Sequence, residues 1–135
     1  MEMTFQRLRG FTLTELIVVV VVLGIMAGFA IPNYTKSIDR SYRKDGTVNL
    51  TAIYAAQQIY YNNNNGSYWP ASGSGDVSAI NSNLGLGILS NNLTYSCSGD
   101  GATFSCTATR TTGPGTMTLT VTQASATPTC SGYCP

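Results

Sequence analysis

Few side chains in this chain of 135 residues could carry out chemistry. The sequence has no histidine, and beyond residue 30 its carboxylates are Asp39, Asp45, Asp76 and Asp100. None of them has a neighbouring nucleophile or base of the kind that acid–base catalysis requires. Asp100 lies between two glycines, which is typical of a turn, because a calcium site needs roughly six or more oxygen ligands. We therefore expect no catalytic residue, no metal site and no cofactor.

The four cysteines are the other reactive groups, and all lie in the C-terminal part of the chain: Cys97, Cys106, Cys130 and Cys134. Zinc sites usually space paired cysteines two residues apart and often add histidine. Here the gaps within the two pairs are eight and three residues, and histidine is absent. The pattern favours disulfide bonds formed outside the cytoplasm.

Glu15 is a carboxylate at the start of an apolar run. Between Phe11 and Ile31 it is the one charged residue among 21, and a helix of that length would span ~31 Å, about one hydrocarbon core. The run therefore predicts a transmembrane helix. An ionised carboxylate in hydrocarbon costs several kcal/mol unless it has a partner, so Glu15 is expected to pair with a cation.

An amine could supply that cation. If the chain is cut after Gly10, the new amine of Phe11 lies four residues from Glu15, and a neighbouring helix shifted along its axis could present its own Phe11 amine. The spacing of Gly24 and Gly28 would also let helix backbones approach closely. These features predict helices that associate between subunits.

The N-terminal pattern resembles a type IV pilin precursor. The resemblance rests on a basic leader ending in Gly10, on Phe11 and Glu15, on the Val/Leu/Ile run and on Ala30-Ile-Pro-Asn-Tyr34. It extends to about residue 69 through the segments 55–61 and 65–69. It implies cleavage after Gly10 by a prepilin peptidase, N-methylation of Phe11, and a filament in which Glu15 neutralises a neighbour's Phe11 amine. It also implies that the helix can loosen between Gly24 and Pro32.

The same resemblance implies partners and location. The partners would be other pilin subunits, the prepilin peptidase, the inner-membrane pilus assembly machinery and, before assembly, membrane lipid. The precursor would cross the inner membrane once with its C-terminus outside the cytoplasm, and then enter an extracellular filament. The leader and the cysteines decide this orientation, although more basic residues follow the helix than precede it.

Two alternatives remain. A type II secretion pseudopilin shares the N-terminal pattern, although cysteine-bridged heads are more usual in pilins than in the calcium-binding major pseudopilins. A conventional secretory signal cut after Ala30 would release a soluble disulfide-bonded protein. After Asp45 only Asp76, Asp100 and Arg110 carry charge, so no nucleic-acid site is expected.

The expected domains are a leader at 1–10, a transmembrane and assembly helix at 11–32, an amphipathic helix at 33–65 and a globular head at 66–135. Together the helices would form one rod of roughly 50 residues. Its apolar face is predicted to contain Tyr34, Ile38, Tyr42, Val48, Ala52, Ala55 and Ile59, which recur at helical spacing. Gly46 predicts a bend, and Gly66 a left-handed cap or turn.

The head is predicted to have few regular elements. Residues 67–92 read as an ordered loop, and residues 123–135 as a tail. Between them, three segments alternate apolar residues with Thr or Ser, which predicts a three-stranded antiparallel meander with one face on the helix. The fold class is thus α+β, with a long N-terminal helix on a small sheet.

Four cysteines permit three pairings. Cys97 and Cys106 share the inward parity on adjacent strands, which favours a bond between them and leaves Cys130 to pair with Cys134. The alternative joins Cys97 or Cys106 to the tail cysteines, in the manner of the long disulfide loop of many pilin heads.

Overall fold

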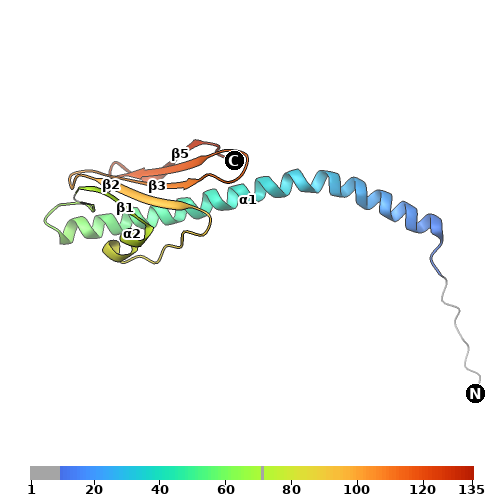
Figure 1. Cartoon of the computed structure of the whole chain (residues 1–135), viewed down its shortest axis with the longest axis horizontal. Coiled ribbons are helices and arrows are strands. Elements are labelled where there is room, and N and C mark those ends of the chain that lie inside the picture. Colours follow the sequence, from blue (N-terminus) through green and yellow to red (C-terminus); the bar gives the residue numbers. More distant parts are fainter. Residues whose placement is uncertain (1–9, 71) are drawn as a thin grey trace, which may run out of the picture. The chain divides into compact units, whose positions relative to one another are not determined.

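The computed structural model describes residues 10–70 and 72–135. Along the chain the elements are α1 (Leu13–Asn63), β1 (Gly73–Asp76), α2 (Val77–Leu84), β2 (Thr94–Gly99), β3 (Phe104–Arg110), β4 (Met117–Thr122) and β5 (Ser125–Gly132) (Figure 1). The chain divides into two compact units, one ending at Ser37 and one spanning Ile38–Pro135, and α1 contributes to both. A long helix and an antiparallel sheet confirm the predicted α+β class.

The long helix α1 has 51 residues and includes Pro32. It begins at Leu13, two residues later than the apolar run suggests, because Thr12 caps it. At its far end Asn65 (φ 54°) and Gly66 (φ 77°) are left-handed, and the N–H of Gly66 donates to the carbonyl of Tyr61 at 3.0 Å. The predicted role of Gly66 in ending the helix is confirmed.

The buried face of α1 differs from the predicted one. Leu50, Ile53 and Gln57 have no exposed surface, whereas Val48 and Ile59 are 58% and 63% exposed. The predicted positions Ala52 and Ala55 are exposed as well. The prediction for this stretch was wrong because it followed apolar residues alone, while the true face includes Asp39, Gly46 and Gln57.

Gly46 lies on that face for a reason other than bending. A Cβ at this position would lie 2.6 Å from Leu119 Cδ1 and 3.1 Å from Leu93 Cδ1. The missing side chain therefore lets α1 approach the sheet closely, which offsets the cost of glycine in a helix.

The sheet has five antiparallel strands in the order β1-β2-β3-β4-β5, not three. The predicted meander corresponds to β2, β3 and β4. The supposed tail supplies β5, and the supposed loop supplies β1. Pro128 in β5 obscured the strand pattern, but proline is tolerated at a sheet edge because its missing N–H is not needed there.

The helix α2 also lies in the segment predicted to be an irregular loop. The Asp76 side chain accepts a hydrogen bond from the N–H of Ala79 at its start, and Gly85 (φ 66°) ends it with a left-handed cap. Ile80 packs into the core with no exposed surface. Aspartate before and glycine after a short segment with apolar residues at helical spacing, Val77, Ile80 and Leu84, are the signals that would have predicted this helix.

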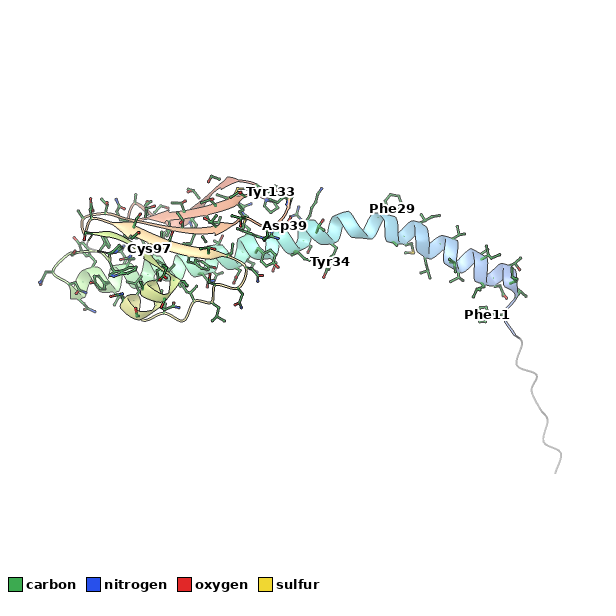
Figure 2. The ribbon with its side chains drawn as sticks, in the orientation of Figure 1. Phe11, Phe29, Tyr34, Asp39, Cys97 and Tyr133 are labelled. Atoms are coloured by element: carbon green, nitrogen blue, oxygen red, sulfur yellow. A yellow bond between two sulfur atoms is a disulfide. The ribbon has the colours of Figure 1, made fainter. Side chains whose placement is uncertain are left out.

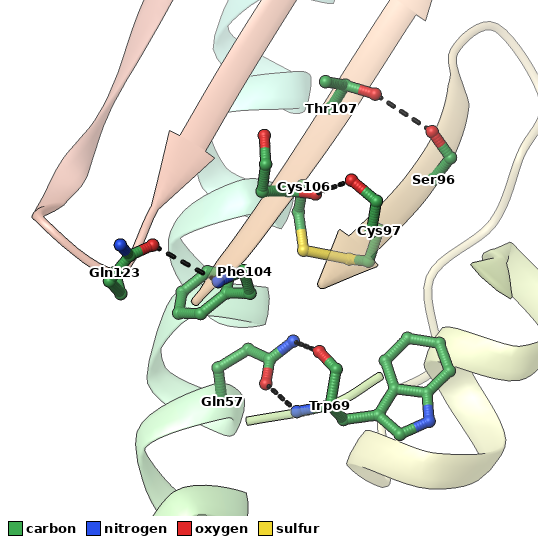
Figure 3. Close-up of a disulfide and its surroundings, with 10 residues drawn as sticks. Gln57, Trp69, Ser96, Cys97, Phe104, Cys106, Thr107 and Gln123 are labelled. Atoms are coloured by element: carbon green, nitrogen blue, oxygen red, sulfur yellow. Dashed lines mark hydrogen bonds between the residues drawn. A yellow bond between two sulfur atoms is a disulfide. The ribbon is translucent and has the colours of Figure 1, made fainter. Parts of the chain in front are cut away.

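The core fills the space between α1 and the inward face of the sheet, with Leu50 and Ile53 meeting Tyr95, Phe104 and Leu119. Fully burying each such side chain contributes about 1.5–3 kcal/mol. Cys97 lies opposite Cys106 in the β2–β3 register, and the two are bonded, as are Cys130 and Cys134. This is the favoured pairing, and Figure 3 shows the first bond, whose two cysteines are buried members of the core.

A polar clasp crosses the same core. The buried Gln57 side chain donates from Nε2 to the carbonyl of Trp69 and accepts the Trp69 N–H at 3.0 Å (Figure 3). Both ends of the amide are thus satisfied, as a buried polar group requires. The clasp fixes the chain that leaves α1 against the helix itself.

Candidate functional site

The start of α1 is built as a capping box. Thr12 Oγ1 accepts the N–H of Glu15 at 3.2 Å, while a Glu15 carboxylate oxygen accepts the Thr12 N–H at 2.9 Å and the Thr12 hydroxyl at 2.8 Å. Two backbone donors at the helix start are satisfied reciprocally. Glu15 thus has a local structural role in addition to the ion pair predicted for it. The Thr-x-x-Glu spacing could have identified Thr12 from the sequence.

Around this start the predicted assembly residues lie open. Phe11 is 84% exposed, and Phe11, Glu15 and Val18 line an open hollow of about 420 Å³. Figure 2 shows the Phe11 ring at the beginning of the helix. One oxygen of the Glu15 carboxylate, Oε1, makes no hydrogen bond among the described residues, so it is available to a cation from another molecule.

The apolar part of α1 is long enough to cross a membrane by length and composition, and none of it is buried within the described structure. Gly24 and Gly28 both lie on this part of the helix, and a Cβ added at either position would meet no atom within 4 Å. Pro32 follows within the same helix. The expected leader, residues 1–10, lies outside the described residues except for Gly10.

The second unit holds an ion-pair network that sequence reasoning missed. Asp39 of α1 is only 4% exposed, and its two oxygens accept from Arg110 Nη1 and from the Tyr133 hydroxyl, the latter at 3.2 Å. The Arg110 guanidinium also lies 4.2 Å from the centroid of the Tyr42 ring. Asp39 and Tyr133 come together in Figure 2. The network ties α1 to β3 and to the segment after β5.

The outward face of the sheet is a second candidate surface. On β2–β5, the residues of this outward face that lie opposite one another on neighbouring strands are all Ser or Thr. We call this set the hydroxyl grid. Its three rows of four are Thr94, Thr109, Thr118 and Ser131; Ser96, Thr107, Thr120 and Thr129; and Ser98, Ser105, Thr122 and Ser125. Neighbouring hydroxyls bond across strands, as between Ser96 and Thr107 at 3.0 Å (Figure 3).

No group of three or more His, Cys, Asp or Glu residues that could hold a metal ion occurs among the described residues. The arrangement as a whole offers an exposed apolar helix with a carboxylate at its start, and a polar head closed by disulfides. Such a helix needs apolar surroundings, either lipid or other helices.

Comparison with known proteins agrees with this geometry. The family model described as the prokaryotic N-terminal methylation motif matches residues 6–31, which include Gly10, Phe11 and Glu15. The chain is homologous to type IV pilins and type II secretion pseudopilins. The pilin family consists of structural proteins without enzymatic activity.

Three relatives define the likeness. The type IV major pilin protein PilA of Myxococcus xanthus is 47% identical over 55 residues, 41% of this chain and 25% of the relative. The type II secretion system core protein G of Klebsiella pneumoniae is 38% identical over 55 residues, 41% of this chain and 39% of the relative. The type IV major fimbrial protein FimA of Dichelobacter nodosus is 53% identical over 38 residues, 28% of this chain and 24% of the relative.

The chain thus spans only about a quarter to two fifths of the length of these curated relatives. No solved structure matches it. The homology therefore rests on part of the chain, and the architecture of the head is known from its own structure.

Proposed function

We propose that the chain is a structural subunit of a type IV pilus filament. A prepilin peptidase would cut after Gly10 and Phe11 would be N-methylated. The apolar helix, residues 11–32, would hold the precursor in the inner membrane and then bundle with other subunits through Gly24, Gly28 and Pro32. Residues 33–65 and 66–135 would form the extracellular head.

The observation that carries this proposal is the open start of α1. The Glu15 carboxylate uses one oxygen for the Thr12 cap and leaves the other without a partner among the described residues, next to the exposed apolar side chains of Phe11 and Val18. Cleavage after Gly10 would create an amine on Phe11 of every subunit. An amine from a neighbouring subunit would then neutralise Glu15, which removes the cost of a bare carboxylate in the bundle.

The first experiment determines the start of the mature chain. Intact-mass analysis of the purified protein should give Phe11, carrying one added methyl group, as the first residue. A chain beginning at Ile31 would instead indicate a secreted soluble form, and one beginning at Met1 an unprocessed membrane anchor. Either result would refute the proposal.

The second experiment separates the charge of Glu15 from its cap. Glu15→Gln keeps an oxygen that accepts from Thr12 but loses the charge, so it should be processed and inserted normally yet yield few fibres. Thr12→Val removes the cap and keeps the charge, so it should still assemble. Normal fibre yield from Glu15→Gln would exclude the ion pair between subunits.

A type II secretion pseudopilin is the alternative, and the identity with core protein G supports it. The two disulfides of the head favour a pilin. Electron microscopy would distinguish a pilin from a pseudopilin. Cells that overproduce the chain would be compared after deletion of the pilus machinery and after deletion of the secretion machinery. A pilin should lose its fibres only in the first strain, and a pseudopilin only in the second.

A further inference from the structure

The hydroxyl grid ends at a concavity of about 600 Å³. Three grid residues, Ser98, Ser105 and Thr122, line it, and Asp100 and Gln123 complete its wall. The polar groups of the wall are therefore continuous with those of the flat face. A chain-like ligand longer than the concavity could therefore extend from it over the grid.

Two of the wall residues are held in place by the backbone. Asp100 Oδ1 accepts the N–H groups of Ala102 and Thr103 and the Thr103 hydroxyl at 2.7–3.1 Å, and Gln123 Oε1 accepts the N–H of Phe104 at 3.2 Å. Asp100 Oδ2 and Gln123 Nε2 make no hydrogen bond among the described residues. In Figure 3 the Gln123 amide nitrogen points away from Phe104.

The concavity thus has both a fixed acceptor and a fixed donor among its lining residues. The hydrogen bonds from Thr103 lower the pKa of Asp100, so its carboxylate stays ionised at neutral pH. A carboxylate that accepts and an amide that donates together match a pair of neighbouring hydroxyl groups, each of which can donate and accept. Gly73, Gly99, Thr103 and Phe104 complete the lining of the concavity.

The rest of the face excludes other classes of ligand. Its rows contain no cation for phosphate, and Arg110, the sole basic residue after Lys44, is held by Asp39. They contain no apolar or aromatic side chain of the kind that dominates protein–protein contacts. Asp76, which is paired with Ser96 at the edge, caps α2. What remains is a neutral array of hydroxyls at strand spacing, about 4.8 Å across and about 6.8 Å along the sheet.

We propose that this face binds a neutral polysaccharide, with one sugar's hydroxyls held by Asp100 and Gln123 in the concavity and the following sugars bonded by the hydroxyl grid. The site lies wholly within the second unit, so it does not depend on filament assembly.

The test measures retention of the full chain, in detergent micelles, on microcrystalline cellulose and on cross-linked dextran, two neutral glucans. Cross-linked alginate serves as the anionic control. We expect retention on at least one glucan, little on alginate because Asp100 repels carboxylates, and release by soluble oligosaccharide of the retaining glucan. Failure to bind either glucan, or equal binding to alginate, would overturn the proposal.

Three variants locate the site. Gln123→Glu keeps the acceptor for the Phe104 N–H and loses the free donor. The double variant Thr107→Val, Thr120→Val removes two grid hydroxyls without changing side-chain shape. Each should weaken retention roughly three- to tenfold per hydrogen bond lost. Thr51→Val, the matched control on the exposed face of α1, should leave retention unchanged. Unchanged retention by both sheet variants would show that the grid is only a solvated surface.

Discussion

Loss of the Asp39 carboxylate should destabilise the second unit strongly. Asp39→Ala leaves the Arg110 guanidinium, whose side chain is 13% exposed, with the Tyr42 ring as its main remaining partner. Removing one member of a buried ion pair costs about 3–5 kcal/mol. We expect the lower end, about 3 kcal/mol, because the Tyr42 ring and some water still contact the cation. For a unit of about 100 residues this lowers Tm by roughly 12–24 °C.

The assay is urea unfolding of the full chain in detergent micelles, followed by fluorescence of the single tryptophan, Trp69, which is 9% exposed. A double-mutant cycle adds Arg110→Met and the double variant. The double variant should be more stable than Asp39→Ala alone, with a coupling of about 2 kcal/mol, since no buried charge is left unpaired. Asp45→Ala, an exposed carboxylate on the same helix, should cost less than about 0.5 kcal/mol.

The reasoning would be refuted by a loss below about 1 kcal/mol for Asp39→Ala, or by additive effects in the double variant. Either outcome would mean that the carboxylate and guanidinium are hydrated rather than mutually dependent, and that the network does not hold α1 to β3.

Three further substitutions, one of them with a control on the exposed face of α1, test the packing of α1 and the sheet. Gly46→Val should lower the free energy of unfolding by about 2–3 kcal/mol through overpacking, while Ala52→Val on the exposed face should cost under about 1 kcal/mol. Gln57→Glu should cost about 2 kcal/mol at pH 7, because the Trp69 carbonyl loses its donor, and the loss should shrink in a pH series below about 5 as the new carboxyl group is protonated. Burial raises the pKa of the Tyr95 hydroxyl in the folded state. Its contribution to the free energy of unfolding is therefore complete below the pKa of about 10 in the unfolded chain, and it declines as the pH rises above that value. Tyr95→Phe should flatten this alkaline decline in denaturation curves measured over a pH series.

The long helix and the central strands could be predicted because each follows a simple period. The apolar run from Leu16 to Ile31 requires a helix in lipid whatever its valines prefer in water. The alternation in β2, β3 and β4 put Cys97 and Cys106 on one face, and the register places them directly opposite. Periodicity was enough to predict these elements, and it favoured the Cys97–Cys106 disulfide over the alternative pairings without deciding between them.

The edge strands could not be predicted, because β1 lacks that alternation and the alternation in β5 contains a proline in place of a large apolar residue. β1 reads Gly-Ser-Gly-Asp and exists through its pairing with β2. β5 contains Pro128 and a register irregularity between Thr120 and Thr122 of its partner strand. Both are strands because a neighbour supplies hydrogen bonds, which a local pattern does not encode.

The candidate site shows the same division. Gly10, Phe11 and Glu15 are visible in the sequence because the helix start is local. The Asp39 network is not, because Arg110 and Tyr133 are 71 and 94 residues away along the chain. Asp39 looks like a solvated charge among basic neighbours until the fold brings its partners together.

The polar and glycine residues on the buried side of α1 explain which way the helix faces. Each residue turns the helix by about 100°, so the Val48 and Ile59 side of α1 lies well away from the Leu50 and Ile53 side. On hydrophobicity alone either side could face the sheet. Only the latter side carries Gly46, which permits close approach to the sheet. It also carries Asp39, whose partner Arg110 lies on β3, and Gln57, whose partner Trp69 lies in the chain that follows α1. Specific contacts therefore override the apolar pattern, and they leave Val48 and Ile59 exposed.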